Sequence, residues 1–169
     1  IKQDRSYSTF KEMAEKESSL EDGIEAVAIV TPNHLHFPIA ECFLSKDIHV
    51  ICDKPLTHNL EDANKFVKAV EDSKALFALT HNYTGYPMVR QAREICQSGK
   101  IGQVRVIQVE YPQDWLTTPL ENANDSPGNK QAFWRTDPSK AGAGGCIGDI
   151  GSHAFNLADF ISGIELEEL

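Results

Sequence analysis

The sequence lacks several features that would assign it to common classes of protein. No apolar run approaches the ~18 residues that a membrane-spanning helix needs. No stripe of Lys and Arg offsets the net charge of −9, so we expect neither a membrane nor a nucleic acid as a partner. No Cys-x-x-Cys pair occurs, which argues against zinc sites and disulfide frameworks and favours reduced thiols in a cytoplasmic protein; the four cysteines are Cys42, Cys52, Cys96 and Cys146.

The composition nevertheless supports a folded protein. Apolar residues make up 41% of the chain and charged residues 24%, a balance that allows a packed core and argues against extended disorder. A length of 169 residues is enough for one ordinary domain, or for one and a half small ones.

Short apolar runs alternate with amphipathic segments through residues 1–100. The run at 26–30 is continuously apolar, as in a parallel strand buried on both faces, and Asn59 is suited to cap the helix that follows it. This alternation is typical of a doubly wound parallel α/β sheet. We predict helices at 9–20, 35–44, 60–70 and 87–97, and strands at 26–30, 49–52 and 75–79.

A polar turn follows each of the three predicted strands. Right-handed crossovers place the carboxyl ends of parallel strands at one edge of a sheet, where ligands bind in open sheets of this kind. The three turns therefore predict a site at that edge. They are Thr31-Pro32-Asn33, Asp53-Lys54-Pro55 and Thr80-His81-Asn82.

The pattern changes after Gly102. Residues 104–111 alternate in the manner of a strand, and 149–161 form a predicted helix that Gly163 ends. Between them, 112–143 is a polar segment so long that it is either functional or contains structure that the pattern hides. We place a domain boundary near residues 99–102, which divides the chain into 1–100 and 101–169.

Three side chains are candidates for chemistry. Asp149 and His153 lie four residues apart on one predicted helix face, and a carboxylate beside an imidazole fixes its tautomer and raises its basicity. Lys54 could reach from the sheet edge to a substrate hydroxyl. Each also has a structural explanation, since Asp149 near a helix start interacts with the helix dipole and exposed lysines are common.

Two other groups admit a binding role. His34 and His36 form a His-x-His pair, but rings on a strand-to-helix turn need not converge, so we predict no metal site. Arg135, next to Trp134, could hold a phosphate, although aromatic residues in such segments often only pack.

Five motifs follow one another along the chain. They are Val-Ala-Ile-Val-Thr-Pro-Asn-His-Leu-His at 27–36, Asp-Lys-Pro at 53–55, Ser-Gly-Lys-Ile-Gly at 98–102, Trp-Arg at 134–135 and Gly-Gly-Cys-Ile-Gly-Asp-Ile-Gly-Ser-His at 144–153. Each is weak alone, but their order and spacing together are specific. From about Tyr7 to Gly163 the chain resembles the glucose-fructose oxidoreductase / inositol dehydrogenase family, often called Gfo/Idh/MocA.

The resemblance implies an NAD(P)-dependent oxidoreductase. Its fold would be the C-terminal half of a Rossmann doubly wound sheet, followed by the start of a second α/β (α+β) domain, and its cofactor would be NAD or NADP. Residue matching makes Lys54, Asp149 and His153 the catalytic group. The residues expected along the cofactor are Thr31, Pro32, Asn33, His36, Asp53, Lys54, Asn82, Trp134 and Arg135.

The chain departs from the family pattern at three points. Asp53 stands where Glu is usual, and Asn156 stands where many members carry Asp. No Gly-x-Gly-x-x-Gly, the fingerprint of the first βαβ unit, occurs. The strand at 26–30 would then lack its family neighbour and form a bare edge, so we expect the native protein to be longer and this piece alone to be inactive.

The activity expected from the resemblance is hydride transfer between nicotinamide and a secondary alcohol of a sugar, polyol or cyclitol. In this scheme His153 is the general base, Asp149 orients its ring, and Lys54 donates to the same substrate oxygen. The alternatives are a non-catalytic NAD(P) sensor and an interaction domain without a cofactor site. The complete protein is expected to form a homo-oligomer, a dimer or a tetramer.

Overall fold

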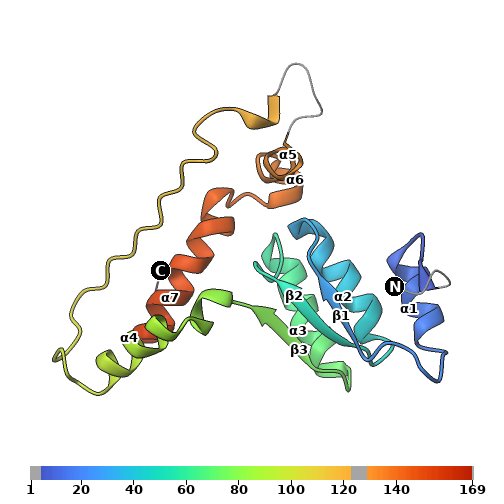
Figure 1. Cartoon of the computed structure of the whole chain (residues 1–169), viewed down its shortest axis with the longest axis horizontal. Helices are drawn as coiled ribbons and strands as arrows, with labels where there is room; N and C mark the ends of the chain where they lie inside the picture. Colours follow the sequence, from blue (N-terminus) through green and yellow to red (C-terminus); the bar gives the residue numbers. More distant parts are fainter. Residues whose placement is uncertain (1–4, 123–128, 169) are drawn as a thin grey trace.

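A parallel sheet forms the centre of the chain. The computed structural model describes residues 5–122 and 129–168. The sheet has three strands in the order β1-β2-β3, and its parallel register pairs β2 with both neighbours. The predicted α/β sheet is therefore confirmed (Figure 1). The strands are β1 (Ala26–Ile29), β2 (His49–Asp53) and β3 (Phe77–Thr80).

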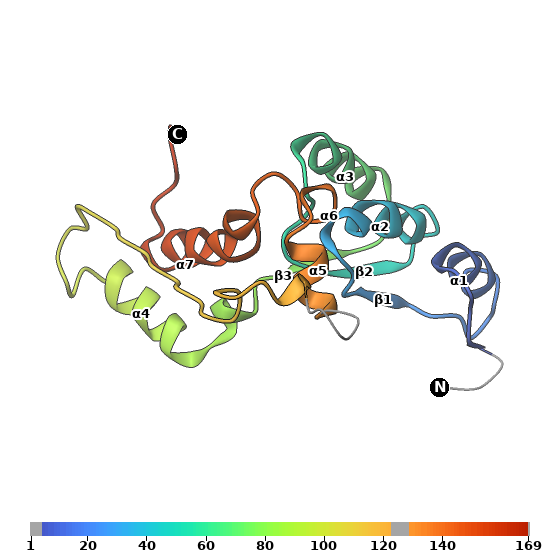
Figure 2. The same cartoon turned by 90° about the horizontal axis from the view of Figure 1, so that it is seen from above.

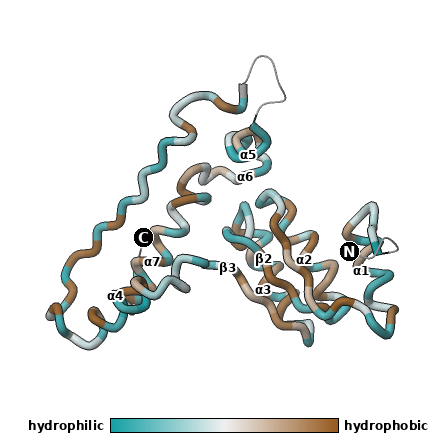
Figure 3. Tube along the Cα trace, viewed as in Figure 1, coloured by the Kyte–Doolittle hydropathy of each residue, from teal (hydrophilic) through white to brown (hydrophobic). Residues whose placement is uncertain are grey.

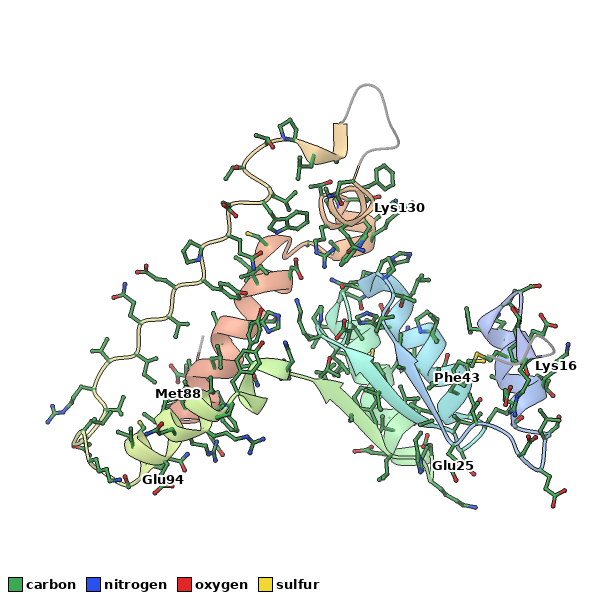
Figure 4. The ribbon with its side chains drawn as sticks, viewed as in Figure 1. Lys16, Glu25, Phe43, Met88, Glu94 and Lys130 are labelled. Atoms are coloured by element: carbon green, nitrogen blue, oxygen red, sulfur yellow. The ribbon has the colours of Figure 1, made fainter. Side chains whose placement is uncertain are left out.

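Two helices cover one face of this sheet. Helices α2 (His36–Leu44) and α3 (Leu60–Asp72) connect successive strands and lie on the same side of them (Figure 2). The buried core between these layers includes Phe43, which Figure 4 labels, together with Val50 and Phe66. Helix α1 (Phe10–Glu17) packs against α2. The predicted cap of α3 is confirmed, because the side chain of Asn59 accepts a hydrogen bond from the backbone N–H of Asp62.

The other face of the sheet differs from the prediction. We expected the strand at 26–30 to be buried on both faces, but Ala26 and Ala28 are exposed and Val30 lies beyond the strand end. Ile51 on β2 is 45% exposed. The reason is geometric: both crossovers advance across the sheet in the same direction, so right-handed connections bring both helices to one face.

Helix α4 (Pro87–Gln97) does not cover the sheet as a third crossover helix would. It follows the 3₁₀ turn η3 (Asn82–Gly85) and packs against α7 (Ser152–Ser162), well away from the strands in Figure 1. Arg93 fixes this packing, because its guanidinium donates to the carbonyl oxygen of Phe160 at 2.6 Å and lies over the Phe160 ring.

The strand predicted at 104–111 is absent. The segment is extended, yet it pairs with no other strand among the described residues. Alternation of apolar residues favours an extended chain, whereas a strand also needs a partner for its backbone hydrogen bonds. Figure 3 shows apolar stretches along this segment as well as in the sheet region.

Short helices fill much of the segment predicted to be a long polar loop. They are η4 (Leu120–Asn122), α5 (Lys130–Arg135) and α6 (Pro138–Ala141). The helix predicted at 149–161 begins instead as a π-helical turn, η5 (Ile147–Gly151), which α7 continues. Asn129 and Asp137 cap α5 and α6 with their side chains. None of the described helices is long and apolar enough to span a membrane.

Gly142 ends α6 in a conformation that suits glycine alone. Its φ is +93°, and a Cβ at this position would lie 2.4 Å from the carbonyl oxygen of His58. At Gly142 the backbone therefore lies close to the loop that precedes α3.

Candidate functional site

The loops after the strands meet the short helices at one edge of the sheet. Thr31, Pro32 and the 3₁₀ turn η2 (Asn33–Leu35) follow β1. Lys54 and Pro55, which are joined by a cis peptide bond, follow β2. The buried side chain of Asn33 donates to the carbonyl oxygen of Ala141 at 3.2 Å. This bond joins the loop after β1 to helix α6, so the first of the predicted polar turns faces α6.

Lys54 and Asp149 form the central ion pair of the site. The Lys54 Nζ donates to Oδ1 of Asp149 at 2.7 Å and to its backbone carbonyl oxygen at 2.5 Å. Both side chains are only 14% exposed. The other carboxylate oxygen accepts from Nε of Arg135 at 2.9 Å. A lysine and a carboxylate that are 95 residues apart in sequence therefore meet directly.

The pKa of Asp149 is lowered by these partners. Burial alone would raise the pKa, because a buried carboxylate loses its hydration. The hydrogen bond and charge of Lys54, together with the charge of Arg135, outweigh this effect and keep the carboxyl ionised. Asp149 is thus a fixed anion between two cations.

Asp149 does not orient the ring of His153 as we expected. Its carboxylate hydrogen bonds within the described residues go to Lys54 and Arg135. The cause is local, because Asp149 lies in the π-helical turn η5 and His153 in the first turn of α7. A π turn closes its hydrogen bonds over five residues, so the four-residue spacing no longer superimposes the two side chains as in a regular α-helix.

His153 is buried at 7% exposure, beside the aromatic ring of Tyr83. Burial lowers its pKa, and the charges of Lys54 and His81 lower it further, whereas Asp149 and Asp53 act in the opposite direction. The net pKa lies below the ordinary value, so the imidazole is neutral near pH 7 and can accept a proton.

One cavity of about 460 Å³ joins the three predicted catalytic side chains. Lys54, Asp149 and His153 all line it. The remaining polar lining comes from the other side of the site: Gln113, Asn129, Gln131, Arg135 and the indole of Trp115. The structure therefore brings the predicted lysine, carboxylate and imidazole to one concave surface rich in hydrogen-bonding groups.

A second cavity of about 590 Å³ lies along the loops after β1 and β2. It shares Lys54, Gln131, Arg135 and Asp149 with the first cavity. All the residues predicted to lie along a cofactor line it, except His36 and Asn82. Two buried polar atoms at this cavity, Thr31 Oγ1 and His34 Nδ1, have no hydrogen-bond partner in the described part of the chain. Unpaired buried polar atoms fit a polar ligand such as a dinucleotide.

His36 and Asn82 occupy different places. The ring of His36 is fully buried, with its nitrogens 2.8 Å from the carbonyl oxygen of Pro55 and 2.9 Å from that of Thr31. The buried ring therefore connects the loop after β1 to the loop after β2. Asn82 is exposed on η3. A direct cofactor contact for either residue stays a prediction.

The shorter side chain of Asp53 is held in place by its neighbour on β3. Its Oδ1 accepts a hydrogen bond from the hydroxyl of Thr80 at 2.6 Å. Asp53 lines the larger cavity together with Trp134, over whose ring the Arg135 guanidinium lies at 4.1 Å. The pair at 134–135 thus lines the same cavity as the strand ends, in agreement with the binding role that the sequence allowed for Arg135.

Sequence reasoning missed Tyr83, Tyr111 and Gln131. Gln131 is central to the helical side of the site, because its side-chain oxygen accepts from both Arg135 at 2.5 Å and Trp134 at 3.2 Å. No motif pointed to it. For Tyr83 the available signal was its place just after the third polar turn. Within residues 5–122 and 129–168, no group of three or more His, Cys, Asp or Glu side chains could hold a metal ion.

Comparison with known proteins assigns each part of the chain to a family model. Residues 3–81 match the model described as "Oxidoreductase family, NAD-binding Rossmann fold", and residues 89–169 match the "GFO/IDH/MocA C-terminal domain". Both models belong to one family, and together they cover nearly all of the chain.

Solved structures agree with this assignment. An oxidoreductase from Sinorhizobium meliloti is 56% identical with a TM-score of 0.78, and 97% of this chain covers 39% of that one. An inositol dehydrogenase homologue from Azotobacter vinelandii, complexed with NAD+, is 30% identical with a TM-score of 0.87, and 94% of this chain covers 39% of it.

A curated relative points the same way. Levoglucosan dehydrogenase from Pseudarthrobacter phenanthrenivorans is 34% identical over 83% of this chain and 33% of its own length. The chain thus spans well under half the length of the relatives that it matches. On the two domain matches, the predicted motifs and the shared fold, the chain belongs to the Gfo/Idh/MocA family of oxidoreductases.

Proposed function

We propose that the protein containing this chain is an NAD(P)-dependent dehydrogenase that acts on a secondary alcohol of a sugar, polyol or cyclitol. The observation that carries the proposal is the shared cavity of Lys54, Asp149 and His153, which adjoins a second cavity along the strand ends. Relatives with levoglucosan or inositol in their names support the substrate class. Bound nicotinamide would supply or accept the hydride.

Lys54 is proposed to bind the substrate oxygen. An ammonium group has three N–H donors, and two of those on Lys54 point to Asp149. The third is available for a hydroxyl or carbonyl oxygen. A fixed positive charge at that oxygen stabilises the negative charge that develops there as the proton leaves.

His153 is proposed to take the hydroxyl proton. Its lowered pKa keeps the ring neutral near pH 7, which is the state a general base needs. In the reverse direction the protonated ring would return the proton to the oxygen. The role of Asp149 follows from its contacts: it pairs with both Lys54 and Arg135 and so positions the two cations in the site.

The amide and indole side chains of the smaller cavity are proposed to contact the rest of the substrate. Gln113, Asn129 and Gln131 offer donors and acceptors suited to vicinal hydroxyls, and Trp115 offers an aromatic face. Within the described residues, the two cations at this cavity, Lys54 and Arg135, are both paired with Asp149. This arrangement favours an uncharged polyhydroxy compound.

Finer features of the complete protein belong to the same proposal. We place the boundary between its cofactor and substrate domains near residues 99–102, and we expect a cytoplasmic dimer or tetramer. The described cysteines are all free thiols, which fits a reducing compartment. Light scattering during size-exclusion chromatography measures the oligomeric state.

The experiment is a substrate screen of the complete protein. Levoglucosan, myo-inositol, D-xylose and related polyols are each offered with NAD+ and with NADP+, and absorbance at 340 nm is followed. We expect turnover of at least one uncharged substrate, with a preference for one cofactor. Dinucleotide binding in a thermal shift assay without any turnover would contradict the proposal and favour the cofactor sensor instead.

A further inference from the structure

Two tyrosines surround the imidazole of His153. The ring of Tyr83 lies against it with a centroid separation of 4.5 Å and an interplanar angle of 35°. The ring of Tyr111 is 6.3 Å away at 58°. The two phenol hydroxyls are hydrogen-bonded to each other at 2.7 Å. We call Tyr83 and Tyr111 the tyrosine pair.

The members of this cluster come from three separate parts of the chain. Tyr83 lies on η3, just after β3, Tyr111 ends the extended segment after α4, and His153 begins α7. Their packing is tilted or edge-on, with 5.9 Å between the two phenol rings. Aromatic groups in such arrangements attract one another beyond their buried area. The tyrosine pair therefore joins the end of the sheet to α7 at the position of the proposed base.

We propose that Tyr83 is a positioning residue that holds the imidazole of His153 and shields one of its faces from water, and that Tyr111 anchors Tyr83 through the hydroxyl–hydroxyl bond. The inference rests on the proposed function for the role of His153. Tyr83 takes the positioning role that the sequence suggested for Asp149, because the carboxylate of Asp149 is hydrogen-bonded to Lys54 and Arg135.

The hydroxyl of Tyr83 does not serve as a base itself. The hydrogen bond with Tyr111 contributes most to raising the pKa of Tyr83 to about 12, so this phenol keeps its proton at neutral pH. The tyrosine pair consequently adds no charge beside His153. The charged or titratable groups that act on the imidazole are Lys54, Asp53, His81 and Asp149, from the ends of β2 and β3 and from η5.

Removing the Tyr83 ring has a predictable direction. Burial is the largest cause of the lowered pKa of His153, and the ring supplies part of that burial. Water that enters in its place would favour the protonated imidazole and move the pKa upward. The imidazole of His153 would also lose its fixed orientation. Both changes would lower the fraction of His153 that is neutral and correctly aligned at neutral pH.

The first test uses Tyr83→Leu in the complete protein with a substrate from the screen. We expect kcat at pH 7 to fall roughly tenfold or more, the scale on which a misplaced catalytic group acts. The acidic limb of the kcat profile should move to higher pH. Tyr86→Leu is the matched control, because Tyr86 is 53% exposed and stacks on Tyr83 but not on His153. An unmoved acidic limb in Tyr83→Leu would overturn the proposal.

The second test isolates the hydroxyl bond and avoids loss of a ring. Tyr83→Phe, Tyr111→Phe and the double variant each remove the same hydrogen bond. We expect the three to show the same small decrease in kcat, because a bond that is already broken cannot be broken again. Additive decreases in the double variant would show that Tyr111 does not anchor Tyr83.

A third measurement does not depend on activity. Exchange of the imidazole Cε1 hydrogen of His153 for deuterium, followed by mass spectrometry across a pH series, reports the titration of this ring alone. We expect Tyr83→Leu to shift that titration upward relative to wild type and Tyr86→Leu. If the screen finds no substrate, this shift would still support the positioning while the proposed function fails. Turnover without any shift would leave the function and remove the positioning role.

Discussion

The two sides of the site are built from different kinds of interaction. The strand-end wall, residues 31–34 and 53–55, extends directly from a hydrogen-bonded sheet whose core includes Phe66. The helical wall, residues 129–153, contains α5 and α6, of six and four residues. Helices this short are not stable by themselves. The site therefore depends on a rigid framework and on a second layer that polar contacts hold to it, among them Asn33 with Ala141 and Lys54 with Asp149.

The largest effect should come from the contact that joins the two walls. Lys54→Met removes the group proposed to bind the substrate oxygen and leaves Asp149 without its closest cation. We expect kcat to fall by about 10²–10⁴-fold, the range typical of a lost catalytic group. Steady-state kinetics of the complete protein measure it. Lys65→Met on α3 is the control, because Lys65 is half exposed and forms ion pairs with Glu61 and Asp62 on its own helix, away from the site. A smaller loss than threefold would remove Lys54 from the mechanism.

A core substitution tests the rigid framework. Phe66 is completely buried and packs against Phe77 with 4.7 Å between ring centroids. Phe66→Ala should lower the free energy of unfolding by about 3–5 kcal/mol. Val67→Ala, one residue further along and 52% exposed, should change it by less than about 1 kcal/mol. Denaturant unfolding measures both. Equal losses would mean that this face of α3 does not carry the framework.

Gly142 tests the weaker wall. A Cβ there would meet the His58 carbonyl oxygen at 2.4 Å, and the positive φ disfavours any side chain. We expect Gly142→Ala to cost about 1–3 kcal/mol of stability and to displace α6 from Asn33. Gly85→Ala is the control, because no heavy atom lies within 4 Å of its added Cβ. If both variants melt at the same temperature, the close approach at Gly142 has no energetic consequence.

The smallest effect concerns pH. The pKa of Asp149 is lower in the folded protein than its ordinary value of 3.8, so its ionisation stabilises the fold above that pH. This contribution should disappear as the pH falls through the folded pKa. Free energies of unfolding from about pH 7 to about pH 3 should therefore decrease more steeply for wild type than for Asp149→Asn. Parallel curves would contradict the pKa shift.

The strand-end wall could be predicted because its signals are local. Continuous apolar runs marked the strands, and the turn at 53–55 followed one of them directly. Parallel pairing then placed Lys54 at the correct edge without any knowledge of its partner. For the same reason the cap at Asn59 was predictable, since its acceptor and donor are three residues apart.

The helical wall resisted prediction because contacts distant in sequence determine it. Nothing local shows that Asp149 binds Lys54 and Arg135 rather than His153, since that choice depends on the π-helical turn. Alternation at 104–111 predicted a strand, but pairing requires a neighbour that a pattern cannot supply. Tyr111 lies in this segment, and its partnership with Tyr83 spans 28 residues.

The side chains shared by the two cavities have a thermodynamic consequence. Four side chains line both cavities, so part of the surface is common to the two: Lys54, Gln131, Arg135 and Asp149. A compound that reorients these groups in one cavity changes the affinity of the other by a coupling free energy. Such linkage is reciprocal: each compound changes the equilibrium affinity of the protein for the other by the same factor. We therefore expect mutations in this shared set to change both affinities together, so that neither can be tuned in isolation.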